Sequence, residues 1–265
     1  MIIDVHGHLG NINFAPFWRA DAARLEECCQ QAGIDLLCLS SARAIMYDVR
    51  EGNAELDAVL RQSQRFLGYV VVNPLFPESR QDLSLLQSNP RFRGVKVHPD
   101  YHGYDLRSAS MAAFLDEVAD SGLVKLMLFH VSCMPGTGFA DALAVASFAE
   151  RHPGVQVIMA HIAGIYQNAN YPYFPNLDKL EAVAARKLPN VFIDTAHFLM
   201  YVYPGVMEKM LSLAGPEHIV FGTDVPLQGP MQMRFAWETI QAPPIPAEKK
   251  EQILWKNAAR LLHLP

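Results

Sequence analysis

Short apolar runs alternate with amphipathic stretches along the whole chain. Eight runs have the length and composition of buried strands: Met1–Val5, Asp35–Ser40, Phe66–Val72, Gly94–His98, Val124–His130, Val155–His161, Val191–Thr195 and Ile219–Asp224. The segments between them carry apolar residues three and four positions apart, as amphipathic helices do. The clearest of these are Ala22–Ala32 ending at Gly33, Asn53–Ser63, Met111–Ser121, Ala140–Arg151, Leu177–Arg186 and Pro204–Ala214. This alternation predicts parallel strands joined by crossover helices.

Eight strand–helix units fit the size of one closed barrel. The chain has 265 residues, which suits a single α/β domain over residues 1–265 with the (β/α)8 TIM barrel fold. A doubly wound open sheet is the second interpretation. No Gly-x-Gly-x-x-Gly follows the first apolar run, so the usual dinucleotide-binding form of that fold is not supported. We find no internal repeat, low-complexity tract or linker.

Polar side chains concentrate where the predicted strands end. They are His6, His8, Lys96, His98, His130, His161 and Asp224. Active sites of (β/α)8 barrels are built from the carboxyl ends of the strands and the loops that follow. Random placement would put the ten histidines of the chain on helices as well. The pattern therefore predicts a functional site at this end of the barrel.

The residue types at this end are those of a metal site. Side chains two apart on a strand share a face, so His6 and His8 point to one side. Taken alone, this pair is equally compatible with solvated or hydrogen-bonded histidines, and His98 could simply cap the end of its strand. Together with His130 and Asp224, however, the imidazoles could hold a divalent ion such as zinc and leave one position open.

A bound zinc ion lowers the pKa of water to about 7, which makes hydroxide available at neutral pH. Asp224 could then accept and transfer the proton. His161, one strand further, could stabilise charge that develops on a substrate oxygen, or act as an acid. The expected catalytic residues are therefore Asp224 and His161.

Several motifs occur in an order that resembles a known family. They are Asp4–His8, Gly94–Pro99, His130 after an apolar strand, His161–Gly164, Phe221–Pro226 and Lys256–Leu262. The chain resembles the amidohydrolase superfamily, and within it the amidohydrolase-related branch that contains aminocarboxymuconate-semialdehyde decarboxylase and the resorcylate decarboxylases. The resemblance runs from the first residues to the last helix, and it implies a metal-dependent barrel.

The resemblance also implies roles for individual residues. His6, His8, His130 and Asp224 match the family's metal ligands, usually of zinc. His161 matches a histidine that is catalytic in decarboxylase-like members with one metal and binds a second metal in binuclear hydrolases. Binuclear members often carry a carbamylated lysine or a glutamate on strand four. The string around Lys96 is typical of the branch with one metal, so we expect one zinc ion and an unmodified lysine, with a second metal as the alternative.

Candidate substrate-binding residues are Lys96, His98 and Arg43. An ammonium at Lys96 could hold a substrate carboxylate, although a buried lysine could also pair with an acid for structure. Arg43 follows the second strand and could grip a carboxylate with two hydrogen bonds, or remain a solvated loop charge. The aromatic stretch 165–175 is expected to form part of a lid or pocket wall, and His197 and Cys133 are further candidates for the pocket lining. A small organic substrate is therefore expected.

Four functions are compatible with these residues. The first is a hydrolase that uses metal-bound hydroxide on an ester, lactone or amide of a small carboxylated compound. The second is a zinc-dependent decarboxylase of a small aromatic or unsaturated acid, which uses the same ligands. The third is a TatD-like nuclease, which expects a Gly-Glu motif where this chain has Lys96. The fourth is a metal-free binding protein, which would have no reason to keep every ligand.

Composition limits the classes of partner and the locations that we expect for this protein. The formal net charge of −5 gives no basic surface for nucleic acid, and no apolar run approaches the roughly 20 residues that a membrane span requires. The first residues show no signal pattern, so we expect a cytoplasmic protein. Four cysteines form neither a disulfide framework nor a Cys-x-x-Cys zinc motif. The apolar stretch 140–148 makes a homodimer a hypothesis.

Overall fold

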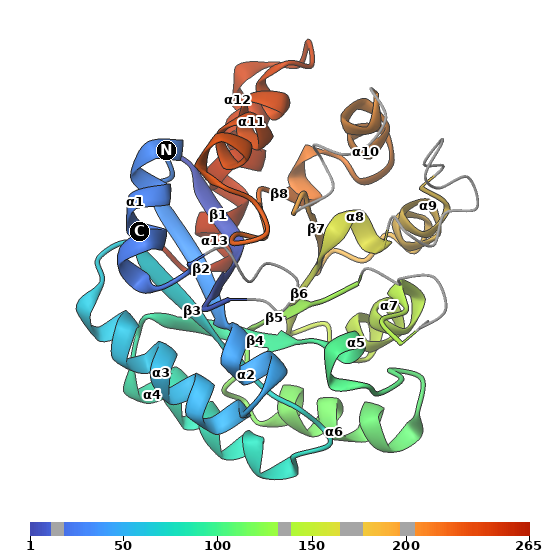
Figure 1. The fold of residues 1–265 in the computed structure, drawn as a ribbon. Coiled ribbons are helices and arrows are strands. Elements are labelled where there is room, and N and C mark those ends of the chain that lie inside the picture. The colour runs from blue at the N-terminus through green and yellow to red at the C-terminus, as the bar shows by residue number, and fades with distance from the viewer. Residues whose placement is uncertain (12–18, 132–138, 165–176, 197–204) are drawn as a thin grey trace.

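The eight predicted strands form one parallel sheet in the computed structural model, which describes residues 1–11, 19–131, 139–164, 177–196 and 205–265. The strands are β1 (Ile3–Leu9), β2 (Leu36–Ser41), β3 (Phe66–Val71), β4 (Phe92–Val97), β5 (Leu126–Phe129), β6 (Gln156–Met159), β7 (Val191–Asp194) and β8 (Ile219–Val220). Each strand pairs in parallel with the next, in the order β1 to β8. The sheet curls as it is followed around, with helices on its outside (Figure 1).

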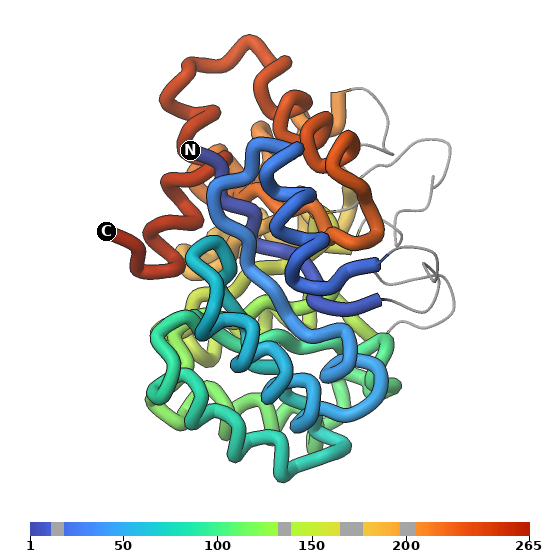
Figure 2. Tube along the Cα trace, turned by 60° about the vertical axis from the view of Figure 1, so that its left-hand side comes forward, coloured from blue at the N-terminus to red at the C-terminus, as the bar shows by residue number. Residues whose placement is uncertain are grey.

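The helices that follow the strands were only partly predicted. The α-helices are α1 (Ala22–Ala32), α2 (Ala42–Met46), α3 (Val49–Gln62), α4 (Leu85–Ser88), α5 (Pro99–His102), α6 (Ala109–Asp120), α7 (Ala142–Arg151), α9 (Asp178–Ala185), α10 (Val206–Ala214), α11 (Pro230–Gln241), α12 (Ala247–Glu251) and α13 (Asn257–Leu261). The chain also forms two 3-10 helices, η1 (Pro77–Ser84) and η3 (Pro216–His218), and one π-helical segment, η4 (Gln252–Lys256). The short element α8 (His161–Gly164) is a left-handed turn. The two ends of the chain lie on the same side of the molecule in both views (Figure 1, Figure 2).

The edges of the sheet, β1 and the chain at β8, meet without a continuous ladder. Three backbone hydrogen bonds join them: Val5 N–H to the Phe221 carbonyl at 2.9 Å, Asp224 N–H to the His6 carbonyl at 2.8 Å, and His8 N–H to the Val225 carbonyl at 2.7 Å. The predicted eight parallel strands are therefore confirmed, whereas the ladder that would close a TIM barrel is not formed. The sheet is TIM-barrel-like, and these hydrogen bonds place the first predicted histidines beside Asp224.

Helix α1 shows why local sequence fixes some boundaries well. Asp21 accepts a hydrogen bond from the Arg24 N–H at 2.9 Å and so caps the first turn. Gly33 ends the helix with a φ of 74°, a left-handed conformation that glycine adopts at little cost. Leu25 and Cys28 are among the residues that the helix buries, and burying a leucine side chain contributes about 1.5–3 kcal/mol. The predicted bounds Ala22–Ala32 are confirmed.

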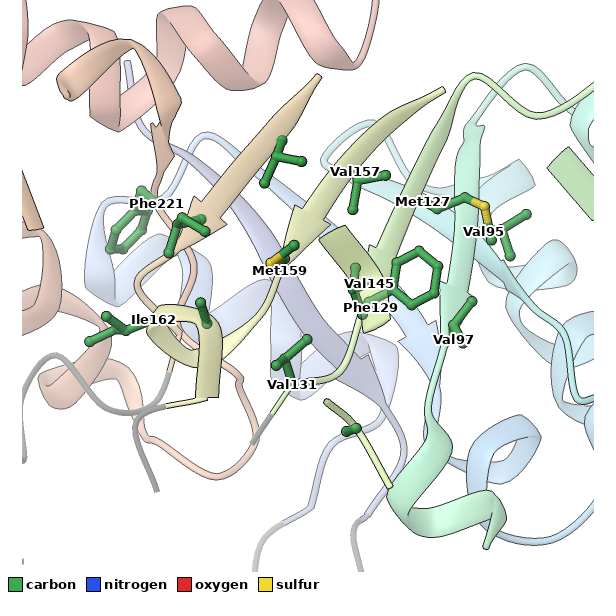
Figure 3. Packing of buried hydrophobic residues seen from close by; sticks show 14 of the residues in the cluster. Val95, Val97, Met127, Phe129, Val131, Val145, Val157, Met159, Ile162 and Phe221 are labelled. Carbon is green, nitrogen blue, oxygen red and sulfur yellow. The ribbon is translucent and has the colours of Figure 1, made fainter. Parts of the chain in front are cut away.

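The main core lies between the outer face of the sheet and the surrounding helices. Valines and larger side chains from β4, β5 and β6 pack together there, and Val145 of α7 packs against them (Figure 3). A second cluster, which includes Cys38, Tyr69, Leu128 and Phe192, is also fully or almost fully buried. Protein interiors are close-packed, so these two clusters fix the positions from which the polar side chains project.

Two predicted strand ends change with the structure. The first strand continues through His6 and His8 to Leu9 instead of ending before them, and the last strand is only Ile219–Val220. The apolar residues of α7 include Val145 and Phe148, which are buried in the core of the same chain, so the homodimer stays a prediction without support from this helix. Among the described residues, no helix is long and apolar enough to cross a membrane.

Candidate metal centre

Three predicted ligands lie together at the junction of β1 and β8. Ligand atoms of His6, His8 and Asp224 lie within 4.8 Å of one another, and all three side chains are buried. The Nε2 atom of His8 is 2.9 Å from Oδ1 of Asp224, and the Nε2 atom of His6 is 3.5 Å from the same oxygen. Since His6 and His8 alternate with Gly7 on β1, strand geometry places both imidazoles on the face toward Asp224.

His130 and His161 lie beside these three residues and contact each other. Nε2 of His161 is 3.1 Å from Nδ1 of His130, and Nε2 of His130 is 3.2 Å from a carboxylate oxygen of Asp100. The His6 and His161 rings are 5.1 Å apart. His130 is therefore in the same cluster, although its nitrogens are not part of the three-residue group that converges on one point.

Lys96 of β4 lies inside the cluster. Its side chain is fully buried, and its Nζ is 2.9 Å from Nε2 of His6. Burial lowers the pKa of Lys96 to about 8, against the opposing attraction of Asp224 and Asp194. The group is still mainly an ammonium at neutral pH, so the structure places a positive charge directly beside the predicted metal ligands.

His98 has a structural role that the sequence left open. Its Nδ1 accepts a hydrogen bond from the Tyr101 N–H at 3.3 Å, which caps α5. Its ring also stacks on His130, with centroids 3.8 Å apart, and on Tyr101 at 4.4 Å. His98 thus caps a helix instead of a strand end, and the stack brings it into contact with the cluster. Its role on a substrate stays a prediction.

Arg43 is in α2, and its guanidinium forms an ion pair with Glu51 of α3 on the protein surface. The side chain is about half exposed. The structure gives the arginine a partner other than the site residues, and its predicted role on a substrate stays a prediction. His197, Cys133 and the aromatic stretch 165–175 lie outside the described residues.

Sequence reasoning assigned no role to two acidic residues that support the cluster. Asp4 accepts hydrogen bonds from the His6 N–H at 3.0 Å and from the Thr223 N–H at 3.1 Å and hydroxyl at 2.6 Å. Asp194 accepts from Nδ1 of His6 at 2.8 Å. A usable signal was present in both cases, because an acidic residue inside a fully buried strand must have polar partners.

The turn that carries His161 is strained. His161, Ile162 and Ala163 have φ values of 58°, 56° and 57°, three consecutive non-glycine residues in the left-handed region. This conformation costs roughly 1–2 kcal/mol for each residue. Ile162 packs in the main core (Figure 3), and Nδ1 of His161 lies 3.2 Å from the Ala196 carbonyl. Such strain persists only where the surroundings hold it, and it is common at functional sites.

Burial decides the charge state of the cluster. It lowers the pKa values of His6, His8, His130 and His161, so these imidazoles are neutral near pH 7. Burial alone would raise the pKa of Asp224, but the neighbouring His6 and His8 outweigh it, and the pKa lies well below its ordinary value. The cluster therefore offers neutral nitrogens and one ionised carboxylate.

This donor set fits a divalent metal ion. Nδ1 of His6 is occupied by Asp194 and Nδ1 of His8 by Ser40 at 2.9 Å, so both Nε2 atoms are left facing the Asp224 oxygen. Metal-bound histidines typically have such a partner on the second ring nitrogen. Two imidazole nitrogens and a carboxylate oxygen suit zinc or a related transition metal.

The chain is similar to one known family and to several solved structures. The family model described as amidohydrolase matches residues 43–264, and no curated protein matches the chain. The solved structure of 5-carboxyvanillate decarboxylase from Sphingomonas paucimobilis aligns with 100% of this chain and 99% of that chain, at 15% identity and a TM-score of 0.71.

An amidohydrolase from Burkholderia multivorans with bound zinc covers 100% of both chains, at 16% identity and a TM-score of 0.74. A dihydroxybenzoic acid decarboxylase from a Polaromonas species, with bound manganese and the inhibitor 2-nitroresorcinol, covers 99% of this chain and 96% of that chain, at 16% identity and a TM-score of 0.71. At these identities the likeness to solved structures establishes the fold.

Proposed function

The chain belongs to the amidohydrolase family, and from that premise we propose that it is a metal-dependent decarboxylase of a small aromatic or unsaturated carboxylic acid. The observation that carries the proposal is the buried group of His6, His8 and Asp224 with the Lys96 ammonium directly beside it. A metal ion and an ammonium at adjacent positions form a site for a carboxylate substrate, because both attract negative charge.

In this proposal, His6, His8 and Asp224 hold one metal ion, with zinc as the preferred metal and His130 as a further ligand. When bound, the ion supplies a Lewis acid that orients the substrate and attracts its negatively charged oxygens. Lys96, unmodified, contributes a second positive charge from β4. Its Nζ lies 2.9 Å from Nε2 of His6, and this nitrogen would exchange that contact for the ion when it binds one.

His161 is the proposed proton-transfer residue. Its Nδ1–H points to the Ala196 carbonyl, which can only accept, so Nε2 is the atom that can take up or release a proton. Burial lowers the pKa of His161 well below the ordinary value, so a proton placed on Nε2 is readily given up. In decarboxylation, the bond between the substrate carbon and its carboxylate breaks, carbon dioxide leaves, and the carbon receives a proton in its place.

Hydrolysis of an ester, lactone or amide was the first choice from the sequence, and it requires the same residues. Two of the three similar structures described above are named as decarboxylases, and this favours decarboxylation.

We also propose that the chain acts as one catalytic domain in the cytoplasm. In addition, we propose that its sheet functions as a closed (β/α)8 barrel, and the three hydrogen bonds between β1 and the chain at β8 support this.

The test uses purified protein loaded with zinc or manganese and a panel of hydroxylated benzoic acids and their esters. Carbon dioxide release and acid release are measured on the same samples. We expect carbon dioxide in equal amount to the decarboxylated product. This release should be lost in the variant His161→Asn and retained in the control variant His152→Asn. His152 lies at the end of α7, and its ring pairs with Asp116. Acid release from esters without carbon dioxide would assign the chain to the hydrolases instead.

A further inference from the structure

One carboxylate contacts both the metal-binding strand and the strained turn. Asp194, the last residue of β7, is fully buried. Its Oδ2 lies 2.8 Å from Nδ1 of His6. Its Oδ1 accepts the backbone N–H groups of His161 at 2.8 Å and of Ala196 at 3.0 Å. Three elements therefore meet at this side chain.

The hydrogen bonds around His6 determine its tautomer. Nδ1 of His6 lies 2.8 Å from Oδ2 of Asp194, and a carboxylate can only accept. Because a neutral imidazole has a single proton, that proton is on Nδ1, and Nε2 carries the lone pair. The lone pair faces the Lys96 Nζ at 2.9 Å, a contact that a metal ion would replace when it binds Nε2.

The same carboxylate holds the entry to the left-handed turn. The His161 N–H that Asp194 accepts belongs to the first of the three residues with positive φ. The Ala196 N–H is held next to it, and the Ala196 carbonyl faces Nδ1 of His161. Asp194 thus fixes both the backbone that carries His161 and the carbonyl that sets the orientation of its ring.

From these contacts we infer that Asp194 is a positioning residue that selects the metal-binding tautomer of His6 and fixes the orientation of His161 with one carboxylate. This inference rests on the proposed metal site. It also assigns a role to the acidic residue at the end of β7, which would otherwise be counted among ligands of a second ion together with His6 and His161. Asp194 is a poor ligand in that group, since its two oxygens already accept three N–H donors.

The substitution Asp194→Asn separates the effect of Asp194 on the His6 tautomer from its effect on the orientation of His161. An asparagine oxygen can keep both backbone N–H donors, and its amide group then faces Nδ1 of His6. Since that amide only donates, His6 would carry its proton on Nε2, where the Lys96 Nζ at 2.9 Å would have to accept it as a neutral amine. Nε2 could then no longer bind a metal. The reverse amide orientation would set the NH2 group against two N–H donors, so it is disfavoured.

The experiment measures the His6 tautomer in the metal-free protein by nitrogen-15 NMR of the imidazole ring, and zinc affinity by competition with a chromophoric chelator. We expect a proton on Nδ1 of His6 in the wild type and on Nε2 in Asp194→Asn, with zinc affinity reduced about 10–100-fold. Asp82→Asn is the matched control, because Asp82 is also buried and accepts from Asn53 at 3.0 Å in a different part of the chain. It should change neither quantity.

A wild-type His6 that carries its proton on Nε2 would overturn the inference, and this measurement needs no variant to fold. Unchanged zinc affinity in a folded Asp194→Asn protein would also overturn it. A merely structural role predicts a lower unfolding temperature without a change of tautomer. Failure of the proposed decarboxylation would leave these readouts unaffected, since neither depends on turnover.

Discussion

His102 provides a quantitative test of the electrostatics around the site. The residue ends α5 and is nine-tenths buried, and its ring lies 6.0 Å from that of Tyr104. Within the described part of the chain, neither of its ring nitrogens has a partner at ordinary hydrogen-bond geometry, although a backbone contact with Ile45 favours the charged form. Burial lowers the pKa of His102 from 6.5 to about 4, and the nearby Lys96 charge adds to the effect.

The sign of the effect on stability follows from proton binding. Between pH 6.5 and pH 4 the unfolded chain binds a proton at His102 that the folded chain does not. The free energy of unfolding is therefore highest above pH 6.5 and falls as the pH drops toward 4. At about 1.36 kcal/mol per pH unit, the change in pKa corresponds to about 3 kcal/mol.

The substitution His102→Phe keeps an aromatic ring beside Tyr104 and removes the titrating group. We expect it to stay within about 1 kcal/mol of the wild type at pH 8. Relative to the wild type, it should gain about 3 kcal/mol as the pH falls from 8 to 4. Urea unfolding at half-unit pH steps measures this difference, with Tyr104→Phe as a control that should show a constant offset. A difference between His102→Phe and wild type that does not vary with pH would refute the reasoning.

Two further pairs of substitutions test the backbone. Lys187 is exposed and has a φ of 52°. Lys187→Gly should therefore relieve left-handed strain and raise the unfolding free energy by about 0.5–1 kcal/mol, whereas the control Lys187→Ala should not raise it. A loss of stability in the glycine variant would contradict this. A Cβ added at Gly52 would lie 2.1 Å from the backbone nitrogen of Ala44, so Gly52→Ala should lower the unfolding free energy by at least about 2 kcal/mol. The control Gly154→Ala, with no heavy atom within 4 Å of the added Cβ, should change the unfolding free energy by less than about 0.5 kcal/mol. Equal losses of stability in Gly52→Ala and Gly154→Ala, measured by thermal unfolding, would contradict the close contact between α2 and α3.

The sequence predicted those parts of the fold that depend on local interactions. The bounds of α1 follow from a capping aspartate, an apolar stripe and Gly33, all of which lie within the segment itself. The last strand was predicted to continue to Asp224, because the run opens with the apolar residues Ile219 to Phe221, yet the paired strand ends at Val220. Apolar character reports burial, and it does not reveal where a backbone leaves the sheet to place a side chain such as Asp224, which has a φ of 65°.

Some residues of the candidate site could likewise be predicted from the sequence, and others could not. Histidines at strand ends could be found because the carboxyl ends of parallel strands meet at one edge of the sheet. Asp194 was missed since its partners, His6 and the His161 N–H, are far away in sequence. Arg43 shows the opposite limit, because its position after a strand predicted a substrate contact and the sequence could not reveal Glu51 as a competing partner.

The proposed function depends most on a metal ion held by the β1 histidines and Asp224. The most direct measurement is the metal content of the purified chain by plasma mass spectrometry, beside the double variant His6→Ala, His8→Ala, after both are incubated with zinc and desalted. We predict about one zinc ion per wild-type chain and almost none in the variant. A wild type without metal, or a folded variant that keeps the same amount as the wild type, would contradict the proposed centre.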